Sequence, residues 1–320
     1  MLGFNKATAC EDLNASLRAA LHKGWEWQDT CPIFVFSGDI EKFFDNCRPR
    51  RVAEACDELK FPPGLTAAIL QENVGLQAHI QFQGQAESSM APYTRCVATG
   101  SVEGPLCSKL LLLAVVLRLL PSWEERGLPA AFAEGAIQRA LTVWVDNLYL
   151  LANSEHALKT MVRELTQGLT AMELRWKPGS LMYLHSKPGV PPVCPLTVGS
   201  PREQLTVKGM KEMPSLGELL DSGGTSRCSV RYRLIKATVH FNILLGEGLL
   251  VGKLEHVLPR FRDFYSRVVP IATLGCGGWA WCRGVHDVIQ GWESRMLRRI
   301  CPAPRVEGED VGVYLQRSVR

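Results

Sequence analysis

Residues 141–152 read LTVWVDNLYLLA, and this stretch decides the fold that we expect. Two apolar runs rich in Val, Trp, Tyr and Leu flank a single polar pair, Asp146 and Asn147. This pattern predicts a β-hairpin that presents a carboxylate at its tip. An aspartate at the tip of an apolar hairpin can bind a metal ion together with a second carboxylate. We therefore expect that second carboxylate on an adjacent strand.

A second apolar run that ends in an aspartate lies upstream. Residues 33–45 read IFVFSGDIEKFFD, in which Asp39 closes the run. We therefore predict that Asp39 and Asp146 meet at the ends of neighbouring strands. The pair suits Mg²⁺, because this ion prefers oxygen ligands and binds through one or two carboxylates plus phosphate and water.

Four stretches resemble motifs A to D of reverse transcriptases of non-LTR (LINE-type) retrotransposons. They are residues 39–45 (DIEKFFD, motif A), 99–107 (TGSVEGPLC, motif B), 145–152 (VDNLYLLA, motif C) and 172–182 (MELRWKPGSLM, motif D). The stretches occur in the family's order, so they support one another. The chain thus resembles a reverse transcriptase domain that is N-terminally truncated and partly degenerate.

The resemblance implies an α+β fold, with a polymerase palm made of an antiparallel sheet backed by helices. Partial fingers and palm are expected over 1–185, a Pro/Gly-rich connector over 186–230, a helical thumb-like domain over 231–300 and a tail over 301–320. Residues 3–12 resemble the stretch that leads into the family's fingers helix. The chain is therefore expected to begin inside the fingers.

Apolar residues at helical spacing predict several helices. These cover residues 13–21, 108–120, 231–245, 253–269 and 288–300. Pro121 is expected to end the second of them, and Ser154 to cap a further helix before residue 158. A half-buried strand is predicted over 78–82, because apolar and polar residues alternate there.

The resemblance assigns catalytic roles to Asp39, Asp146, Asn147 and Lys177, and places Ile40 on the substrate side. Asp39 and Asp146 would hold two Mg²⁺ ions, with Mn²⁺ as the alternative, and Asn147 would be a weakened third ligand. The backbone carbonyl of Ile40 would supply another oxygen. Lys177 would neutralise or protonate the leaving pyrophosphate. Without the resemblance, Lys177 would be interpreted as a surface lysine.

Three further residues would contact the substrate. Phe44 matches the family's steric gate, an aromatic ring that leaves no room for a 2′ hydroxyl. Gly104 and Pro105 would keep the backbone close to the nucleotide and shape the template pocket. From the residues alone, the simpler interpretation of Phe44 is core packing beside Phe43.

Four positions depart from the family's pattern. Asn147 stands where motif C has a second aspartate, and a neutral amide should lower metal affinity. Glu103 replaces a glutamine of motif B and would place negative charge near an anionic triphosphate. Phe43 and Cys107 are milder changes. A decayed copy of the element is therefore an open alternative.

The composition is that of an ordinary globular protein, with 46% hydrophobic and 21% charged residues among 320. The 11 cysteines include no CxxC pair, which favours reduced thiols in an intracellular compartment. Cys276 and Cys282 lack a second pair of ligands for a metal. No signal peptide is recognised, and the longest apolar run, 110–120, is too short to cross a bilayer, so no membrane partner is expected.

The charge is distributed unevenly. Residues 1–226 carry 21 positive and 24 negative side chains, whereas residues 227–300 carry 12 positive and 5 negative. A polyanion would therefore be held mainly by the C-terminal third, although a solvated basic face explains the charge equally well. Trp279, Trp281 and Trp292 suit base stacking or, more simply, the core of a small helical domain.

Three hypotheses for function follow. The leading one is an RNA-directed DNA polymerase fragment, a nucleotidyltransferase that uses an RNA template, a DNA primer and deoxynucleotides. The alternative is a catalytically inactive, reverse-transcriptase-like protein that binds nucleic acid. The third is an unrelated α+β structural protein. The sequence contains no GxSxG, P-loop or HExxH motif and leaves the oligomeric state open.

Overall fold

The computed structural model describes most of the chain. The described residues are 9–27, 31–71, 77–82, 85–92, 104–131, 140–187, 196–198, 204–251, 257–301, 306–310 and 313. Of residues 77–82, 85–92 and 196–198, only the backbone is described. The stretch 3–12, which resembles the entry to the fingers, thus lies largely outside the described residues.

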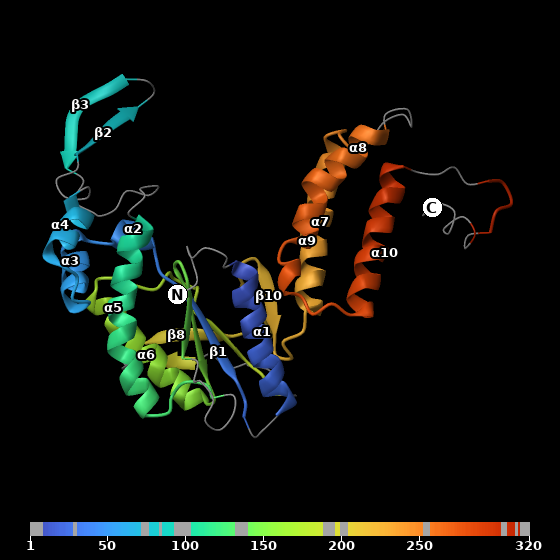
Figure 1. Cartoon of the computed structure of the whole chain (residues 1–320). Coiled ribbons are helices and arrows are strands. Elements are labelled where there is room, and N and C mark those ends of the chain that lie inside the picture. The colour runs from blue at the N-terminus through green and yellow to red at the C-terminus, as the bar shows by residue number, and fades with distance from the viewer. Residues whose placement is uncertain are drawn as a thin grey trace.

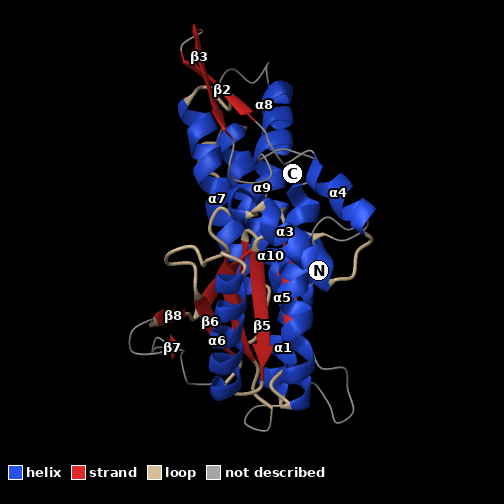
Figure 2. Cartoon of the chain, turned by 90° about the vertical axis from the view of Figure 1, so that its left-hand side faces the viewer, coloured by secondary structure: helices blue, strands red, loops and turns tan. Residues whose placement is uncertain are grey.

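A six-stranded sheet organises the N-terminal two thirds of the chain (Figure 1). Its strands, in spatial order, are β4 (Leu141–Trp144), β5 (Asn147–Ala152), β1 (Phe34–Asp39), β6 (Met182–His185), β8 (Leu205–Gly209) and β7 (Leu196–Val198). The predicted sheet was antiparallel, but the observed one is mixed, because β6 and β8 run parallel. The parallel pair arises because β7 occupies the outer edge and β8 returns from it beside β6 (Figure 2).

Alternation along the strands gives the sheet two apolar faces. Phe34, Phe36 and Leu150 pack in one core, whereas Val35 and Tyr149 pack in another. Such alternation follows from the period of two of a β-strand. Because both faces are apolar, both must be covered.

Helices from different parts of the chain cover the two faces (Figure 1). The first face carries α2 (Phe43–Asn46), α3 (Pro49–Glu58), α5 (Gly104–Glu125) and α6 (Glu155–Ala171), with α4 (Pro63–Gln71) packed against α3. The second face carries α1 (Cys10–Glu26) and the hairpin of β9 (Glu212–Ser215) and β10 (Glu218–Asp221).

The apolar spacings predicted for α1 and α6 are confirmed, as is the cap predicted for α6. Leu13, Leu17 and Leu21 of α1 are buried. Ser154 caps α6, since its Oγ accepts a hydrogen bond of 3.1 Å from the backbone N–H of Ala157. In both helices, the apolar positions in the sequence are thus the positions that the fold buries.

The prediction that Pro121 ends the apolar helix is wrong. Helix α5 begins at Gly104 and passes through Pro121 to Glu125. The turn after the proline is held because buried Trp123 donates from its Nε1 to Oε2 of Glu164 on α6, at 2.8 Å. Among the described residues, α5 has the length and hydropathy of a membrane span, yet its side chains Leu111 and Leu112 lie in the core.

The region expected to be a connector, 186–230, instead contains strands. Its described part supplies β7 and β8 to the sheet and the β9–β10 hairpin to the second apolar face. Its prolines and glycines suggested an irregular segment, but the buried residues Val207, Met213 and Leu220 anchor these short strands.

A separate two-stranded hairpin projects from the α3–α4 side (Figure 1). It consists of β2 (Gln77–Phe82) and β3 (Gln85–Pro92). The strand predicted over 78–82 is thereby confirmed.

The C-terminal third forms a helical unit with a core of its own. Its elements are α7 (Arg227–Gly246), α8 (Val257–Asp263), a π-helical turn (Phe264–Val268), α9 (Val269–Thr273), a 3₁₀ turn (Cys276–Gly278) and α10 (Arg283–Ile300). The single helix predicted over 253–269 is therefore interrupted by the π-helical turn and continues into α9. Phe241, Phe264 and Trp292 pack together at the centre.

The tryptophans of this unit divide between core and surface. Trp279 and Trp292 are buried, which confirms the core interpretation for both. Trp281 is 57% exposed, so it does not anchor the core. Val288, the first residue of the apolar spacing predicted over 288–300, is 52% exposed, because this part of α10 borders an open groove.

Candidate active site

The hairpin tip that the sequence singles out is a strained turn. Trp144 and Asn147 pair across the hairpin, so Val145 and Asp146 form its two-residue loop. Val145 has a φ of 56°, in the left-handed region that β-branched residues rarely adopt. Backbone strain of this kind concentrates at functional sites, and Asp146 is the next residue of the turn.

Strand β1 brings the second carboxylate to the same end of the sheet. Asp39 pairs with Asn147 in the β1–β5 register, and the backbone N–H of Ile40 donates to the carbonyl oxygen of Asp146 at 3.0 Å. Partial burial raises the pKa of Asp146, and the nearby Asp39 carboxylate raises it further. The structure thus brings together the two aspartates that the sequence pairs.

Lys177 joins this pair from a loop that follows α6. Its backbone N–H donates to the carbonyl oxygen of Asp39 at 2.8 Å, and its Nζ lies 2.9 Å from Oδ2 of the same residue. The hydrogen bond to Asp39 raises the pKa of Lys177. Ser180 adds a further contact, since its Oγ accepts from the backbone N–H of Asp39 at 3.2 Å. A lysine 138 residues away in sequence is therefore held beside the carboxylates.

Asn147 turns its amide nitrogen toward the site. Its Nδ2 donates to Oδ1 of Asp146 at 2.9 Å, so it acts as a hydrogen-bond donor to the carboxylate. Oδ1 of Asp39 is buried and has no hydrogen-bond partner among the described residues. An unpartnered carboxylate oxygen beside a second, poorly solvated carboxylate fits a hard divalent cation. The described residues contain no group of three or more His, Cys, Asp or Glu that could hold a metal.

The predicted substrate-binding residues lie on elements next to the carboxylates. Phe44 belongs to α2, is half-buried, and its ring lies 6.2 Å from that of Phe43 between centroids. Gly104 and Pro105 open α5, against which α2 packs. Ile40 is buried directly after Asp39. Residues 99–103 of the motif B resemblance, Glu103 included, lie outside the described residues, whereas Cys107 is buried in α5.

The arginines at the start of α3 are engaged within the protein. Arg48 and Arg51 form ion pairs with Glu173 at 2.6 and 2.9 Å, and Arg50 pairs with Glu54 at 3.0 Å. The three guanidinium groups are thus held by carboxylates of the same chain.

A buried polar network behind the site was missed by the sequence analysis. Arg18 of α1 forms an ion pair with Glu218 of β10, and both side chains are almost fully buried. Asn14 donates to Oε1 of Glu218 at 3.1 Å, and Ser215 Oγ contacts both Asn14 Oδ1 at 2.5 Å and Tyr149 OH at 3.0 Å. The sequence contained a sign of this network. Asn14 and Arg18 are one helical turn apart on the face that carries the buried leucines, and polar residues on such a face must find buried partners.

The network ties the β9–β10 hairpin to the sheet that carries the carboxylates. Burial raises the pKa of Tyr149 to about 12, so its hydroxyl stays protonated. Leu216 and Gly217 form the hairpin turn with φ values of 45° and 88°. Positive φ values at both positions are those of a tight hairpin turn of the primed type.

Comparisons with known proteins add a fold likeness only. One similar solved structure is telomerase from Candida tropicalis in complex with a fragment of telomeric RNA, with a TM-score of 0.47 and 11% sequence identity. The likeness covers 96% of this chain and 49% of that one, so the chain spans about half the length of the telomerase. No protein-family profile and no curated protein sequence matches the chain.

Proposed function

We propose that the chain is the palm and thumb part of an RNA-directed DNA polymerase of the non-LTR retrotransposon type. The observation that carries the proposal is the convergence of Asp39 and Asp146 at one end of the sheet, with Lys177 beside them. Two carboxylates and a lysine at the exposed end of a sheet suit phosphoryl transfer, in which positioning and charge stabilisation do most of the work.

Each residue then has a defined task. Asp39 and Asp146 would hold Mg²⁺ or Mn²⁺, through Asp39 Oδ1 and the carboxylate of Asp146. When bound, the cations stabilise the charge that develops on the phosphate oxygens and lower the pKa of the primer hydroxyl. The primer 3′ hydroxyl would lose its proton to solvent as its oxygen forms a bond to the α-phosphorus, and the bond from that phosphorus to the bridging oxygen would break. Lys177 gives a proton to the departing pyrophosphate.

The substrate side of the proposal rests on α2 and α5. Phe44 would exclude a 2′ hydroxyl, while Gly104 and Pro105 would border the nucleotide. Phe44→Ala should therefore raise ribonucleotide incorporation relative to deoxynucleotide incorporation. Phe43→Leu is the matched control, because Phe43 is buried and its ring packs away from solvent.

Primer extension on an RNA template with Mg²⁺ or Mn²⁺ tests the proposal. We expect template-dependent extension that disappears in Asp39→Ala and in Asp146→Ala. Asp287→Ala is the matched control, since this aspartate is exposed on α10 far along the chain. Extension that survives both substitutions would contradict the assignment of the site.

A second candidate function is binding of nucleic acid without synthesis. Two contacts favour it: the Asn147 amide donates to Asp146, and the Lys177 ammonium is paired with Asp39. The two contacts give one oxygen of each carboxylate a partner without a metal. Binding of an RNA–DNA duplex without extension under either cation would support this candidate over the first.

A further inference from the structure

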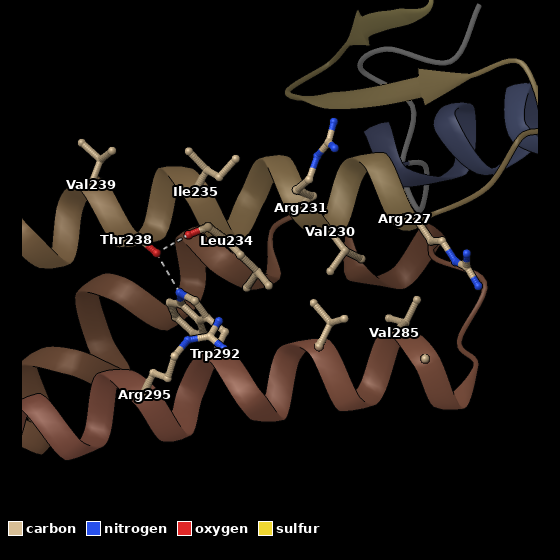
Figure 3. A pocket seen from close by; sticks show the side chains of 12 residues that line it. Arg227, Val230, Arg231, Leu234, Ile235, Thr238, Val239, Val285, Trp292 and Arg295 are labelled. Carbon is tan, nitrogen blue, oxygen red and sulfur yellow. Dashed lines mark hydrogen bonds between the residues drawn. The ribbon is translucent and has the colours of Figure 1, made fainter.

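The helical C-terminal unit has an open apolar groove between α7 and α10 (Figure 3). The groove has a volume of about 730 Å³. Its floor consists of the buried side chains Val230, Leu234, Val285 and Trp292. Its polar atoms are satisfied internally, because Thr238 Oγ1 accepts from Trp292 Nε1 at 2.9 Å and donates to the carbonyl oxygen of Leu234 at 2.7 Å. The floor therefore offers an incoming molecule chiefly apolar contact.

The walls of the groove carry aliphatic side chains that are not covered by any other described residue. Ile235 and Val239 of α7 are 56% and 55% exposed, and Val288 of α10 is 52% exposed. Ile243, one turn beyond Val239, extends the stripe with 51% exposure. Isolated exposed aliphatic residues are common, but a contiguous stripe beside an apolar groove indicates an interaction surface.

Arginines stand at the rim of the same groove (Figure 3). Arg227 and Arg295 form no ion pair or side-chain hydrogen bond with other described residues, whereas Arg231 pairs with Glu212 at 2.9 Å. Two cations without partners at the edges of an apolar groove call for an occupant with acidic groups at its own edges.

We propose that this groove binds an acidic amphipathic helix of a partner protein. Along α7 the groove extends from Arg227 to Val239, which at 1.5 Å per residue is about 18 Å, or a little over three helical turns. An aliphatic face of that length would lie against Ile235, Val239 and Val288, and flanking glutamates or aspartates would meet Arg227 and Arg295. This is the helix-in-groove mode of recognition.

The chemistry of the groove favours a peptide over a nucleic acid. Nucleic-acid surfaces combine rows of cations with exposed aromatic rings on which bases stack. Here the exposed side chains are β-branched aliphatics, and Trp292 is buried with its N–H engaged. Only the rim is cationic.

Fluorescence anisotropy with the full chain and three labelled synthetic peptides of about 18 residues tests the proposal. The first has leucines on one helical face and glutamates on the other. The second replaces each glutamate with lysine, and the third keeps the composition of the first but scatters its leucines around the helix. We expect the first to bind at least about tenfold more tightly than the others.

Variants then locate the binding. Ile235→Ser combined with Val239→Ser, and separately Arg227→Glu combined with Arg295→Glu, should each weaken binding of the acidic peptide by about tenfold. Leu258→Ser is the matched control, because Leu258 is a 77% exposed aliphatic residue on α8, away from the groove. All four groove residues are exposed, and circular dichroism of each variant should match that of the unsubstituted chain.

Three outcomes would overturn the proposal. The first is equal binding of the acidic peptide and its scattered counterpart, or no binding of either. The second is a loss of affinity in Leu258→Ser as large as that in the groove variants. The third is an RNA–DNA duplex whose binding is lost in the groove variants and is not displaced by the acidic peptide, which would assign the surface to nucleic acid.

Discussion

The ammonium group of Lys177 lies 2.9 Å from Oδ2 of Asp39 and so occupies one side of the carboxylate pair. A divalent cation at the same carboxylate would compete with this ammonium. Lys177→Met should therefore tighten binding of Mn²⁺, by up to about tenfold, while lowering the rate of primer extension because the proton donor is lost. Isothermal titration gives the first quantity and single-turnover extension the second.

Lys208→Met is the control for that experiment, because Lys208 is an exposed lysine on β8 of the same sheet. It should change neither quantity. Weaker Mn²⁺ binding in Lys177→Met would show that the ammonium supports the metal site and does not compete with it.

Replacing Asn147 by aspartate should restore a third carboxylate. Asn147→Asp is expected to raise Mn²⁺ affinity by about tenfold, since ligand charge sets the affinity of oxygen sites. Without a divalent cation, the same variant should melt at a lower temperature, because three carboxylates then repel one another. Thermal melts with chelator and with Mn²⁺ measure both effects.

Asn147→Ala separates charge from hydrogen bonding, since it removes the donor to Asp146 Oδ1 and adds no carboxylate. It should not tighten metal binding. If Asn147→Asp binds Mn²⁺ no better than Asn147→Ala, the position does not face the metal.

The raised pKa of Asp146 predicts a pH-dependent stability. Because its pKa is higher in the folded than in the unfolded chain, protonation favours folding, and this stabilisation is lost as the pH rises through the folded pKa. Asp146→Asn mimics the neutral acid and keeps an acceptor for Asn147. In the presence of a chelator, we expect this variant to melt a few degrees higher than the unsubstituted chain at neutral pH. The difference in melting temperature should shrink as the solution is acidified.

Urea denaturation from about pH 4 to about pH 8 measures how the free energy of unfolding differs between Asp146→Asn and the unsubstituted chain. Asp287→Asn, on the exposed face of α10, should show no such trend. If the stability gained by Asp146→Asn grew toward acid pH, the pKa of Asp146 would not be raised in the folded chain.

Removing one partner of the buried Arg18–Glu218 pair should destabilise the protein more than neutralising both partners. Arg18→Met leaves Glu218 charged and buried, which is expected to cost about 3–5 kcal/mol in the free energy of unfolding. Adding Glu218→Gln should recover more than half of that loss, since the amide oxygen still accepts from Trp279 Nε1, which lies 3.1 Å from Oε2 of Glu218. Urea denaturation of the single and double variants measures the recovery. A double variant no more stable than Arg18→Met would show that the charge is not the cause.

Gly224 packs against the backbone of α1 and should not tolerate a side chain. Its φ is +62°, and an added Cβ would lie 2.3 Å from the carbonyl oxygen of Arg18. Gly224→Ala is therefore expected to cost about 3 kcal/mol or more. Gly179→Ala is the matched control: it has a φ of +77° but no atom within 4 Å of the added Cβ, so it should cost only about 1 kcal/mol of backbone strain. Equal costs would mean that contact with α1 does not matter.

The sequence by itself determined the local elements of the site. The alternation in 141–152 predicted the β4–β5 hairpin, and the run that ends at Asp39 predicted β1. Helices α1 and α6 followed from apolar spacing and, for α6, from the cap at Ser154. These elements are specified by residues a few positions apart, so a linear pattern contains their physical cause.

Apart from the meeting of Asp39 and Asp146, which the sequence predicted, only the tertiary structure decided which distant residues meet. The pairing of Lys177 with Asp39 depends on the order of strands in the sheet, and the Arg18–Glu218 pair depends on the packing of α1 against a hairpin about 200 residues later. The strands within 186–230 escaped prediction for the same reason, since their short apolar runs are stabilised by neighbours from other parts of the chain. Burial and long-range pairing arise from the arrangement of the whole chain, and no local pattern encodes them.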